Sequence, residues 1–322
     1  MLKRYALLLL LLVAPICVFA QAAPSYTVAE IALLKYAPTT VPTFSYGAAP
    51  AGIAFDGQHI WIASSGDGRV IPLNTFDGSG AALGPGSVGT SPWALAYDGE
   101  YMWVTSYPDS AVYKFRPSGG SPISYPIKYG SRGIAFDGTY MWIANQPHNC
   151  VTRIRAIDGA FATCFPIGKE PMNVAFDGTD IWVTNFGDNT VSKLNTQTGA
   201  VIGTYSSGGS QPWGIAFVPE PIYGGARLMV VTNAGSNTAV LMLLDGSVNA
   251  TIPVGLVPRG VIYDGHDVWV ANSSSSSLSK IDWIDGGTTV TNYPVGKQPY
   301  ALAFDGANVW AVNYGSNSVS KR

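Results

Sequence analysis

Seven variants of one phrase, Pro-x-Gly-Ile-Ala-Phe-Asp-Gly, divide this sequence of 322 residues into copies of nearly equal length. The intervals between successive copies are 42, 39, 40, 41, 46 and 41 residues. A period of about 40 residues with strand-like content is typical of β-propeller blades and argues against a helical solenoid. The first position of the phrase falls at Pro50, Pro92, Ser131, Pro171, Pro212, Pro258 and Pro299.

Each copy contains four short strand-like segments bounded by turn residues. In the fourth copy the runs "NVAF" and "IWVTN" flank an Asp-Gly pair, and "TVSKLN" and "AVIGTY" flank the turn "TQTG". The first two runs are apolar at nearly every position, which suits sheets covered on both faces, as stacked blades are. We therefore predict an all-β fold, a seven-bladed β-propeller of four-stranded antiparallel blades.

Two further positions of the repeat hardly vary. One is Trp in six copies and Val230 in the other, and we interpret it as packing between blades, with a ligand role as the alternative. The Trp residues are Trp61, Trp103, Trp142, Trp182, Trp269 and Trp310. The Asp-Gly pairs are interpreted as turns, with calcium binding as the alternative; they begin at Asp56, Asp98, Asp137, Asp177, Asp264 and Asp305.

The two ends of the repeat region complement each other. After Trp310 the chain has room for only one more strand, "SNSVSKR", so the last copy lacks its outer strand. The segment "TVPTFSYGAAP", which begins at Thr40, is similar to the outer strand of other copies. We predict that this N-terminal strand completes the last blade and closes the ring, which removes an open sheet edge. The propeller domain then spans residues 40–322, preceded by a lead-in of residues 23–39.

The first residues have the pattern of a secretory signal peptide. Two cations precede an apolar run that ends in small residues, which predicts a signal peptide over residues 1–22 with cleavage after Ala20 or Ala22. An uncleaved anchor helix is the alternative, although the run is short and is broken by Pro15. We expect a secreted or periplasmic protein with no membrane span once the signal is removed.

Charge and composition narrow the classes of partner. Only 12% of the residues are charged and the formal net charge is -2, so the basic footprint of a nucleic-acid-binding protein is missing. The apolar content of 47% is too high for a disordered chain. We expect a monomer that binds no nucleic acid.

Cys150 and Cys164 remain after the signal peptide is removed. In an oxidising compartment such a pair can form a disulfide. Both residues lie in one repeat, on strands that we expect to be neighbours in a hairpin. They form a disulfide if their side chains share a face of the sheet, and they are buried thiols if the faces are opposite.

The stretch "PMNVAFDGTDIWVTNFGDNTVSKL", from Pro171 to Leu194, resembles the YVTN-type bacterial propeller repeats. It is more distantly similar to the NHL repeats and to the virginiamycin B lyase group. The resemblance extends from Pro50 to Arg322 and implies the propeller architecture. It does not imply one activity, because this superfamily includes lyases, binding modules and secreted proteins of other kinds.

Two variable positions of the repeat suggest a binding site. The residue after the Pro and the residue after the second strand should lie on one face, around the central channel, and many are aromatic or Arg. Rings offer stacking faces, and guanidinium groups bind carboxylate, sulfate or phosphate. A small molecule, a glycan or a protein is the expected partner; loop residues that only pack on neighbouring loops are the alternative. The predicted ligand-binding rim comprises Trp93, Arg132, Met172, Trp213, Arg259, Tyr300, Tyr107, Phe186 and Tyr314.

The resemblance to the lyases implies a His and Glu pair, with a further His and a divalent metal, on the same face. His59 and His266 follow Asp-Gly turns and therefore belong on the opposite face, whereas His148 lies in a rim loop. Its possible partner for acid and base chemistry is Glu170, directly before Pro171. No metal-ligand cluster is visible in the sequence. We favour a binding module without cofactor; a lyase using His148 and Glu170 and a carbohydrate-binding propeller are the alternatives.

Overall fold

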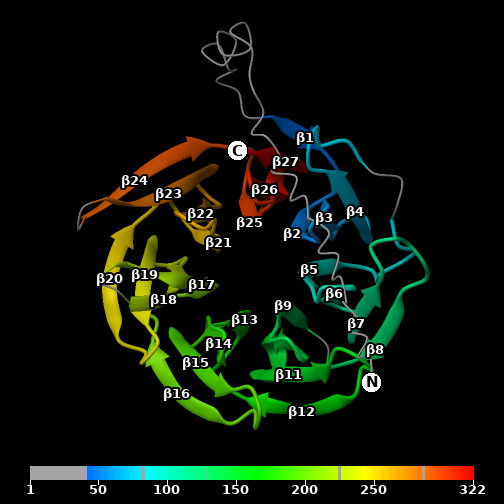
Figure 1. Cartoon of the computed structure of the whole chain (residues 1–322), viewed down its shortest axis with the longest axis horizontal. Helices are drawn as coiled ribbons and strands as arrows, with labels where there is room; N and C mark the ends of the chain where they lie inside the picture. Colours follow the sequence, from blue (N-terminus) through cyan, green and yellow to red (C-terminus); the bar gives the residue numbers. More distant parts are fainter. Residues whose placement is uncertain (1–41, 81–83, 129, 224–225, 285–286) are drawn as a thin grey trace, which may run out of the picture. The chain divides into compact units, whose positions relative to one another are not determined.

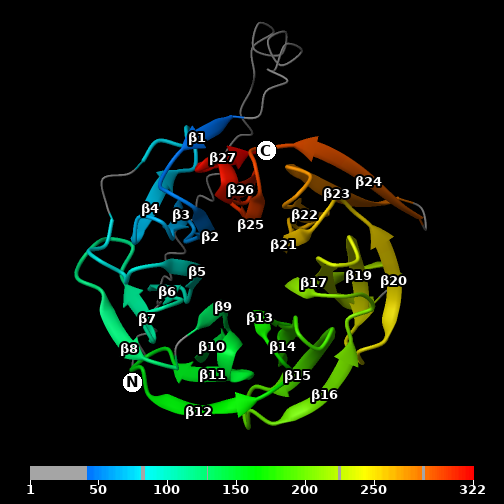
Figure 2. The same ribbon diagram turned by 180° about the vertical axis from the view of Figure 1, so that it is seen from behind.

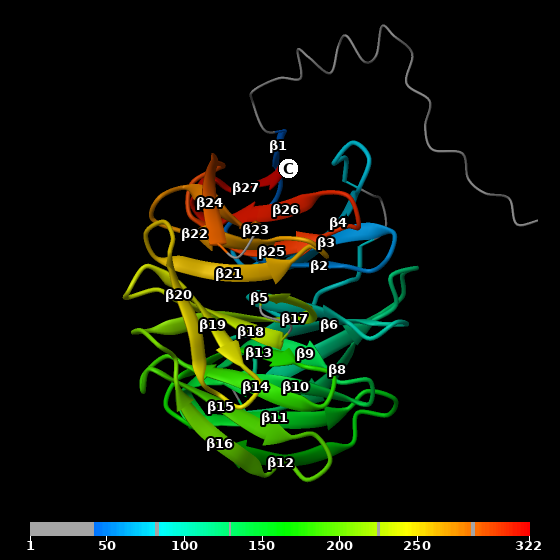
Figure 3. The ribbon, with the colours of Figure 1, turned by 60° about the vertical axis from the view of Figure 1, so that its left-hand side comes forward.

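Seven β-sheets surround a central channel in the computed structural model (Figures 1 and 2), which describes residues 42–80, 84–128, 130–223, 226–284 and 287–322. The sheets are stacked side by side, with their strands seen edge-on in Figure 3. The predicted seven-bladed all-β propeller is therefore confirmed. The proposed signal peptide and the whole lead-in lie outside the described residues.

Within each blade the strands are antiparallel and succeed one another from the channel outward. Blades 1 and 2 contain β2 (Pro50–Phe55), β3 (His59–Ser64), β4 (Arg69–Asn74), β5 (Pro92–Tyr97), β6 (Met102–Ser106), β7 (Ala111–Phe115) and β8 (Ile123–Pro126). Blades 3 and 4 contain β9 (Ser131–Phe136), β10 (Tyr140–Asn145), β11 (Cys150–Arg155), β12 (Phe161–Pro166), β13 (Pro171–Phe176), β14 (Asp180–Asn185), β15 (Thr190–Asn195) and β16 (Val201–Ser206).

The remaining blades follow the same order. Blades 5 and 6 contain β17 (Pro212–Tyr223), β18 (Ala226–Asn233), β19 (Thr238–Leu243), β20 (Val248–Pro253), β21 (Pro258–Tyr263), β22 (Val268–Asn272), β23 (Ser277–Ile284) and β24 (Gly287–Pro294). Blade 7 contains β25 (Pro299–Phe304), β26 (Val309–Asn313), β27 (Ser318–Lys321) and β1 (Thr43–Ser45). Six sheets have four strands, and the sheet of blade 1 has three in the part of the chain that the structure describes.

The ring is closed by the N-terminal strand, as predicted. β1 pairs antiparallel with β27, so that Thr43 lies opposite Ser320 and Ser45 opposite Ser318. A second link crosses the same junction, because the Lys321 ammonium group donates to the carbonyl oxygen of Thr75 in blade 1 at 2.7 Å. Figure 1 shows β1 (blue) beside β27 (red). The last blade is thus assembled from both ends of the described chain.

The repeated Trp and the repeated Asp are joined by a hydrogen bond. In blade 3, Asp137 Oδ1 accepts the backbone amides of Thr139 and Tyr140, which fixes the turn, and Oδ2 accepts the indole N–H of Trp142. Six blades contain this indole bond, at 2.7 to 2.8 Å. Blade 5 has lost both partners together, with Val218 in place of the Asp and buried Val230 in place of the Trp. The Asp-Gly turn role is confirmed, and each carboxylate also satisfies a buried indole.

Asp305 makes this bond sensitive to acid. Burial raises its pKa, but hydrogen bonds from the Trp310 indole and from the amides of Asn308 and Ala307 lower it more, so the pKa falls below the ordinary 3.8. A carboxyl whose pKa is lower in the folded state stabilises the fold above the unfolded pKa, and this contribution disappears as the pH falls through the folded pKa.

Asp305→Asn should therefore destabilise the protein by about 1 to 2 kcal/mol at pH 7, because the indole loses a charged acceptor. The difference from wild type should shrink on acidification from about pH 4 downward, since the wild-type carboxyl then becomes neutral. Urea unfolding of both proteins at pH 7, 5 and 3 measures this. A difference that is the same at all three pH values would contradict the assignment.

In four blades a cation of the third strand connects the blade to the next one. This Lys or Arg lies over the Trp ring of its own blade, 4.9 to 5.4 Å from the ring centre. Its N–H groups donate to a carbonyl oxygen in the outer turn of the following blade. The pairs are Lys114 with Ala156, Arg153 with Thr196, Lys193 with Leu244 and Lys321 with Thr75. The Trp therefore packs inside a junction between blades.

Cys150 and Cys164 form a disulfide between β11 and the outer strand β12, with their Cα atoms 5.8 Å apart. The register places Thr152 opposite Cys164, so Cys150 is two residues from the direct partner. Because side chains alternate between the faces of a strand, an offset of two residues keeps both sulfur atoms on one face. The bond ties the outer strand of blade 3 to its neighbour.

Candidate functional site

The first predicted rim position is the second residue of each innermost strand, beside the channel. Hydroxyl groups of the preceding blade hold its backbone in three places. Thr105 donates to the carbonyl of Arg132, Thr184 to that of Trp213, and Thr232 to that of Arg259, at 2.6 to 2.9 Å. The backbone at these positions is therefore fixed by contacts between neighbouring blades, and the side chains start from defined points.

The rim side chains meet across the channel. Tyr300 of blade 7 is 8% exposed and lies edge-to-face with Trp93 of blade 2 and Trp213 of blade 5, with ring centres 5.4 and 5.6 Å apart. Blade 1 carries only Ala51 at this position, which leaves room for Tyr300 to reach Trp93. Edge-to-face pairs of this kind are favourable beyond the area they bury. The rim is thus a packed cluster across one end of the channel.

Both rim arginines are enclosed by rings. The guanidinium carbon of Arg132 lies 4.3 Å from the ring centre of Trp93 and 4.1 Å from that of Tyr107. That of Arg259 lies 4.2 Å from Trp213 and 4.4 Å from Tyr300. Each guanidinium group is therefore flanked by two aromatic rings, which favour a cation at this position.

The second predicted rim position adds an outer layer of rings. Tyr107 packs against Trp93, Phe186 against Trp213, and Tyr314 against Tyr300, with ring centres 5.6 to 6.4 Å apart. We call the whole group the mouth cluster. It comprises Trp93, Tyr107, Arg132, Phe186, Trp213, Arg259, Tyr300 and Tyr314. The ninth predicted residue, Met172, is buried and lines the channel below the cluster.

The mouth cluster carries positive charge without a carboxylate. None of the ion pairs found among the described residues includes Arg132 or Arg259. Burial lowers the pKa of Arg132, and the charge of Arg259 lowers it further, whereas Tyr300 and Tyr107 oppose this shift. Burial raises the pKa of Tyr300 to about 12. Tyr300 is therefore neutral at neutral pH.

The hydrogen bonds of the two arginines differ. Arg132 Nε donates to Gln146 Oε1 at 2.7 Å. Arg259 Nε is buried and has no hydrogen-bond partner among the described residues. A buried donor without a partner is costly, so Arg259 is held at this position at an expense in stability.

Two hollows adjoin the mouth cluster. The central channel below it has a volume of about 200 Å³ and is lined by the innermost strands, including Met172 and Asn173. A second hollow of about 310 Å³, which we call the side pocket, lies over blades 6 and 7. It is lined by Trp93, Arg259, Ser273, Gln298, Tyr300 and Tyr314.

No protein-family model and no curated protein matches the sequence. Several solved structures are nevertheless similar to this chain. The chain is similar to a streptogramin B lyase, with 16% identity over 88% of this chain and 96% of that chain and a TM-score of 0.72. It is similar to virginiamycin B lyase from Staphylococcus aureus with quinupristin, with 16% identity, coverage of 88% and 98%, and a TM-score of 0.73. It is also similar to a chain of the mitotic checkpoint complex, with 12% identity, coverage of 88% and 95%, and a TM-score of 0.75.

These likenesses identify the architecture. The chain is a β-propeller. At such identities the comparison extends to the fold alone, because propellers of one shape carry unrelated sites. Within the described part of the propeller, no helix is long and apolar enough to cross a membrane.

His148 and Glu170 come from adjacent blades of the propeller. His148 ends the short helix η1 (Gln146–His148) and is half-buried, whereas Glu170 is exposed. Asn149 Oδ1 accepts the backbone N–H of Glu170 at 3.0 Å, so the two loops touch. No cluster of three or more His, Cys, Asp or Glu residues able to hold a metal exists among the residues whose placement is described.

The other two histidines lie at Asp-Gly turns, as expected. His59 Nδ1 is 3.6 Å from Asp56, and His266 Nδ1 is 3.0 Å from Asp267. These turns connect the first two strands at their ends away from the mouth cluster. His59 and His266 are therefore separated from the rim loops by the length of a strand.

Two residues of the side pocket were not singled out from the sequence. Ser273 occupies the second rim position of blade 6 but is neither aromatic nor charged. Gln298 precedes Pro299, which is the place that Glu170 takes in blade 4, and both have left-handed backbones with φ of 51°. Their place in the repeat was a usable signal, because residues at equivalent positions of a propeller share one face.

Proposed function

We propose that this propeller is a binding module whose ligand is held at the mouth cluster. We further propose that it acts outside the cytoplasm, in the periplasm or after secretion, once residues 1–22 have been removed. The observation that carries the binding proposal is the pair of half-buried guanidinium groups, Arg132 and Arg259, in a cluster with no carboxylate. A cluster of aromatic side chains that only stabilised the fold would not need these two arginines, because burying a cation without an ion pair lowers the stability of the fold.

The geometry favours a small molecule over a glycan. Carbohydrate rings stack on open aromatic faces, but Trp93 and Trp213 each have a guanidinium group over the ring and a further contact with the ring of Tyr300. The side pocket, by contrast, presents several polar groups that converge beside aromatic walls, which is typical of small-molecule sites. The carbohydrate-binding alternative is therefore less well supported.

The enzyme alternative has one observation in its favour. The solved structures that resemble this chain include proteins named as lyases, and the loops of His148 and Glu170 touch through Asn149. A binding module should nevertheless leave quinupristin unchanged after prolonged incubation, as checked by mass spectrometry. Cleavage that His148→Ala abolishes would replace the binding proposal by the lyase alternative.

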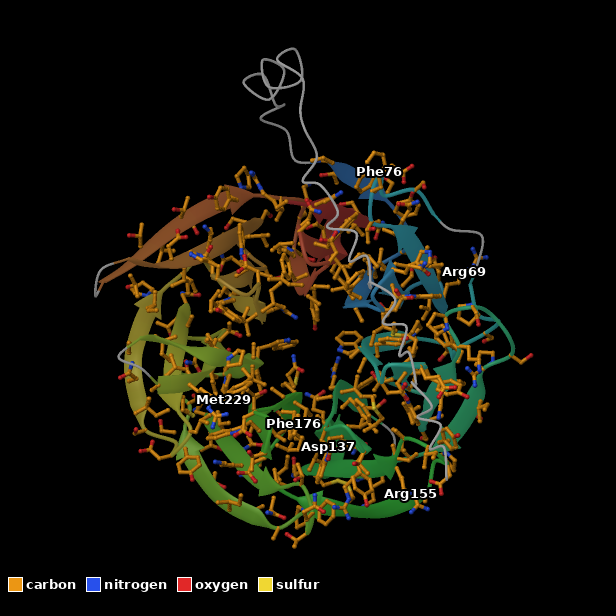
Figure 4. All side chains as sticks on the ribbon, viewed as in Figure 1. Arg69, Phe76, Asp137, Arg155, Phe176 and Met229 are labelled. Carbon is orange, nitrogen blue, oxygen red and sulfur yellow. A yellow bond between two sulfur atoms is a disulfide. The ribbon has the colours of Figure 1, made fainter. Side chains whose placement is uncertain are left out.

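Crystals soaked with a set of neutral and charged aromatic fragments test the location of the site. Bound fragments should gather at the mouth cluster, and Trp213→Ala should lose them. Phe76→Ala is the matched control, because Phe76 is 88% exposed at the outer edge of the ring (Figure 4). Fragments that gather instead at the face of the Asp-Gly turns would overturn the proposal.

A further inference from the structure

The side pocket assigns a chemical class to the ligand. We propose that it binds a small aromatic carboxylate, with the carboxylate at Arg259 and Ser273 and the ring against Trp93 and Tyr314. This inference rests on the proposed function and specifies it. It follows from the lining of the pocket, from a serine hydroxyl group that has no hydrogen-bond partner among the described residues, and from the number of cations that line the pocket.

The polar groups of the pocket suit an anion. Its lining contains a guanidinium group, an amide and three hydroxyl groups, and it contains no carboxylate. All of these groups can donate a hydrogen bond, and Tyr300 stays neutral at pH 7 because burial raises its pKa to about 12. An anion in this pocket meets donors and one positive charge, whereas a cation meets repulsion from Arg259.

Ser273 differs from its counterpart in blade 1 in a way that indicates a ligand. Both serines follow the second strand and donate their backbone N–H to the residue before the repeat's Pro, Ser65 to Ala49 and Ser273 to Val257. The Ser65 hydroxyl also donates to the carbonyl of Ala49 at 2.7 Å. Ser273 is only 5% exposed, yet its hydroxyl group makes no hydrogen bond to the part of the chain that is described.

Two aromatic rings hold Arg259 beside the pocket. The ring centres of Trp213 and Tyr300 lie 4.2 and 4.4 Å from its guanidinium carbon and 5.6 Å from each other, so both rings flank the group and it also lines the side pocket. A guanidinium edge matches the two oxygens of a carboxylate with two parallel hydrogen bonds. The donors that Arg259 does not use within the protein are thereby available to the ligand.

The single cation selects a singly charged ligand. Arg132 is bound to Gln146 on the other side of the cluster and does not line the side pocket. A phosphate dianion would leave one charge uncompensated there, whereas one carboxylate is balanced by Arg259. The volume of about 310 Å³ is at the lower end for ligand pockets, and its aromatic walls suit a flat ring.

The test is isothermal titration of the wild-type propeller with three probes: benzoate, its neutral analogue benzamide, and inorganic phosphate. Benzoate should bind with a Kd of about 1 mM, as expected for so small a ligand. Benzamide and phosphate should each bind at least about tenfold more weakly than benzoate. Benzamide lacks the negative charge, and the phosphate dianion carries more negative charge than Arg259 balances.

Variants then locate the binding. Arg259→Gln should weaken benzoate binding at least about tenfold, and Ser273→Ala about threefold, while benzamide binding changes little. Arg69→Gln is the control for net charge, because Arg69 is exposed in β4, away from the channel (Figure 4), and it should leave benzoate binding unchanged. Ser273→Ala removes only one hydroxyl group and keeps the test valid if Arg259→Gln unfolds.

The outcomes separate the two proposals. Equal binding of benzoate and benzamide, unaffected by Arg259→Gln and Ser273→Ala, would overturn the carboxylate and leave a binding site at the mouth. Tighter binding of phosphate than of benzoate would also overturn it. If none of the probes binds and the soaked fragments avoid the mouth cluster, the proposed function fails together with this inference.

Discussion

Trp182→Ala is expected to lower the free energy of unfolding by about 3 to 5 kcal/mol, the usual cost of removing a fully buried aromatic side chain. Trp182 has no exposed surface, and its indole N–H donates to Asp177 Oδ2 at 2.8 Å. The Lys193 ammonium group lies 4.9 Å from the centre of the Trp182 ring and donates a hydrogen bond to the carbonyl oxygen of Leu244 in the next blade. The substitution therefore leaves a cavity, and it leaves the Oδ2 atom of Asp177 without its indole donor, at a junction between two blades.

Trp213→Ala is the matched control for this experiment. Trp213 is half-buried at the mouth cluster, so its removal should cost less stability, about 1 to 2 kcal/mol. The same variant should lose ligand binding, whereas Trp182→Ala should retain it under conditions in which it is folded. Guanidinium unfolding followed by circular dichroism gives the stabilities. A larger loss for Trp213→Ala than for Trp182→Ala would show that the two positions have the opposite roles.

Deletion of residues 21–47 is expected to produce aggregation or severe destabilisation, because it removes β1 and exposes the edge of β27. Unpaired strand edges promote association between molecules. The deletion also removes Phe44, whose ring stacks on that of Trp310 with centres 6.1 Å apart. Light scattering coupled to gel filtration, together with a thermal melt, measures the effect.

A shorter deletion of residues 21–39 is the control, because it keeps β1. If the longer deletion gives a monomer that melts at the same temperature as the shorter one, closure by β1 does not stabilise the ring.

The repeat predicted the architecture because each copy contains the same pattern of four short strands. Seven such copies are compatible with few folds other than a seven-bladed propeller. It also predicted that Trp93 and Tyr300 face one end of the channel, since equivalent positions of a ring share a face. It did not predict that Tyr300 reaches two other blades. That contact depends on the small size of Ala51 and on the distances across the channel, neither of which a periodic pattern contains.

Other features depend on register and on pairing. The faces of Cys150 and Cys164 remained open because the offset between β11 and β12 is set by the pairing of the hairpin. The bond between Asp137 and Trp142 follows a constant spacing of five residues, so the sequence did contain a signal for it. The packing of Trp93 and Trp213 against Tyr300 could not be predicted, because these contacts join different blades.

The position of β1 in blade 7 has a consequence for the biogenesis of the protein. The paired hydroxyl groups of Thr43 and Ser320 are 277 residues apart in the chain. β1 is synthesised before any other strand of the ring, yet its partner β27 is synthesised last. During translation, therefore, blades 1 to 6 can form in order while β1 is still unpaired. The final closure is a long-range step, which is intrinsically slow, and it cannot begin until β27 has been synthesised.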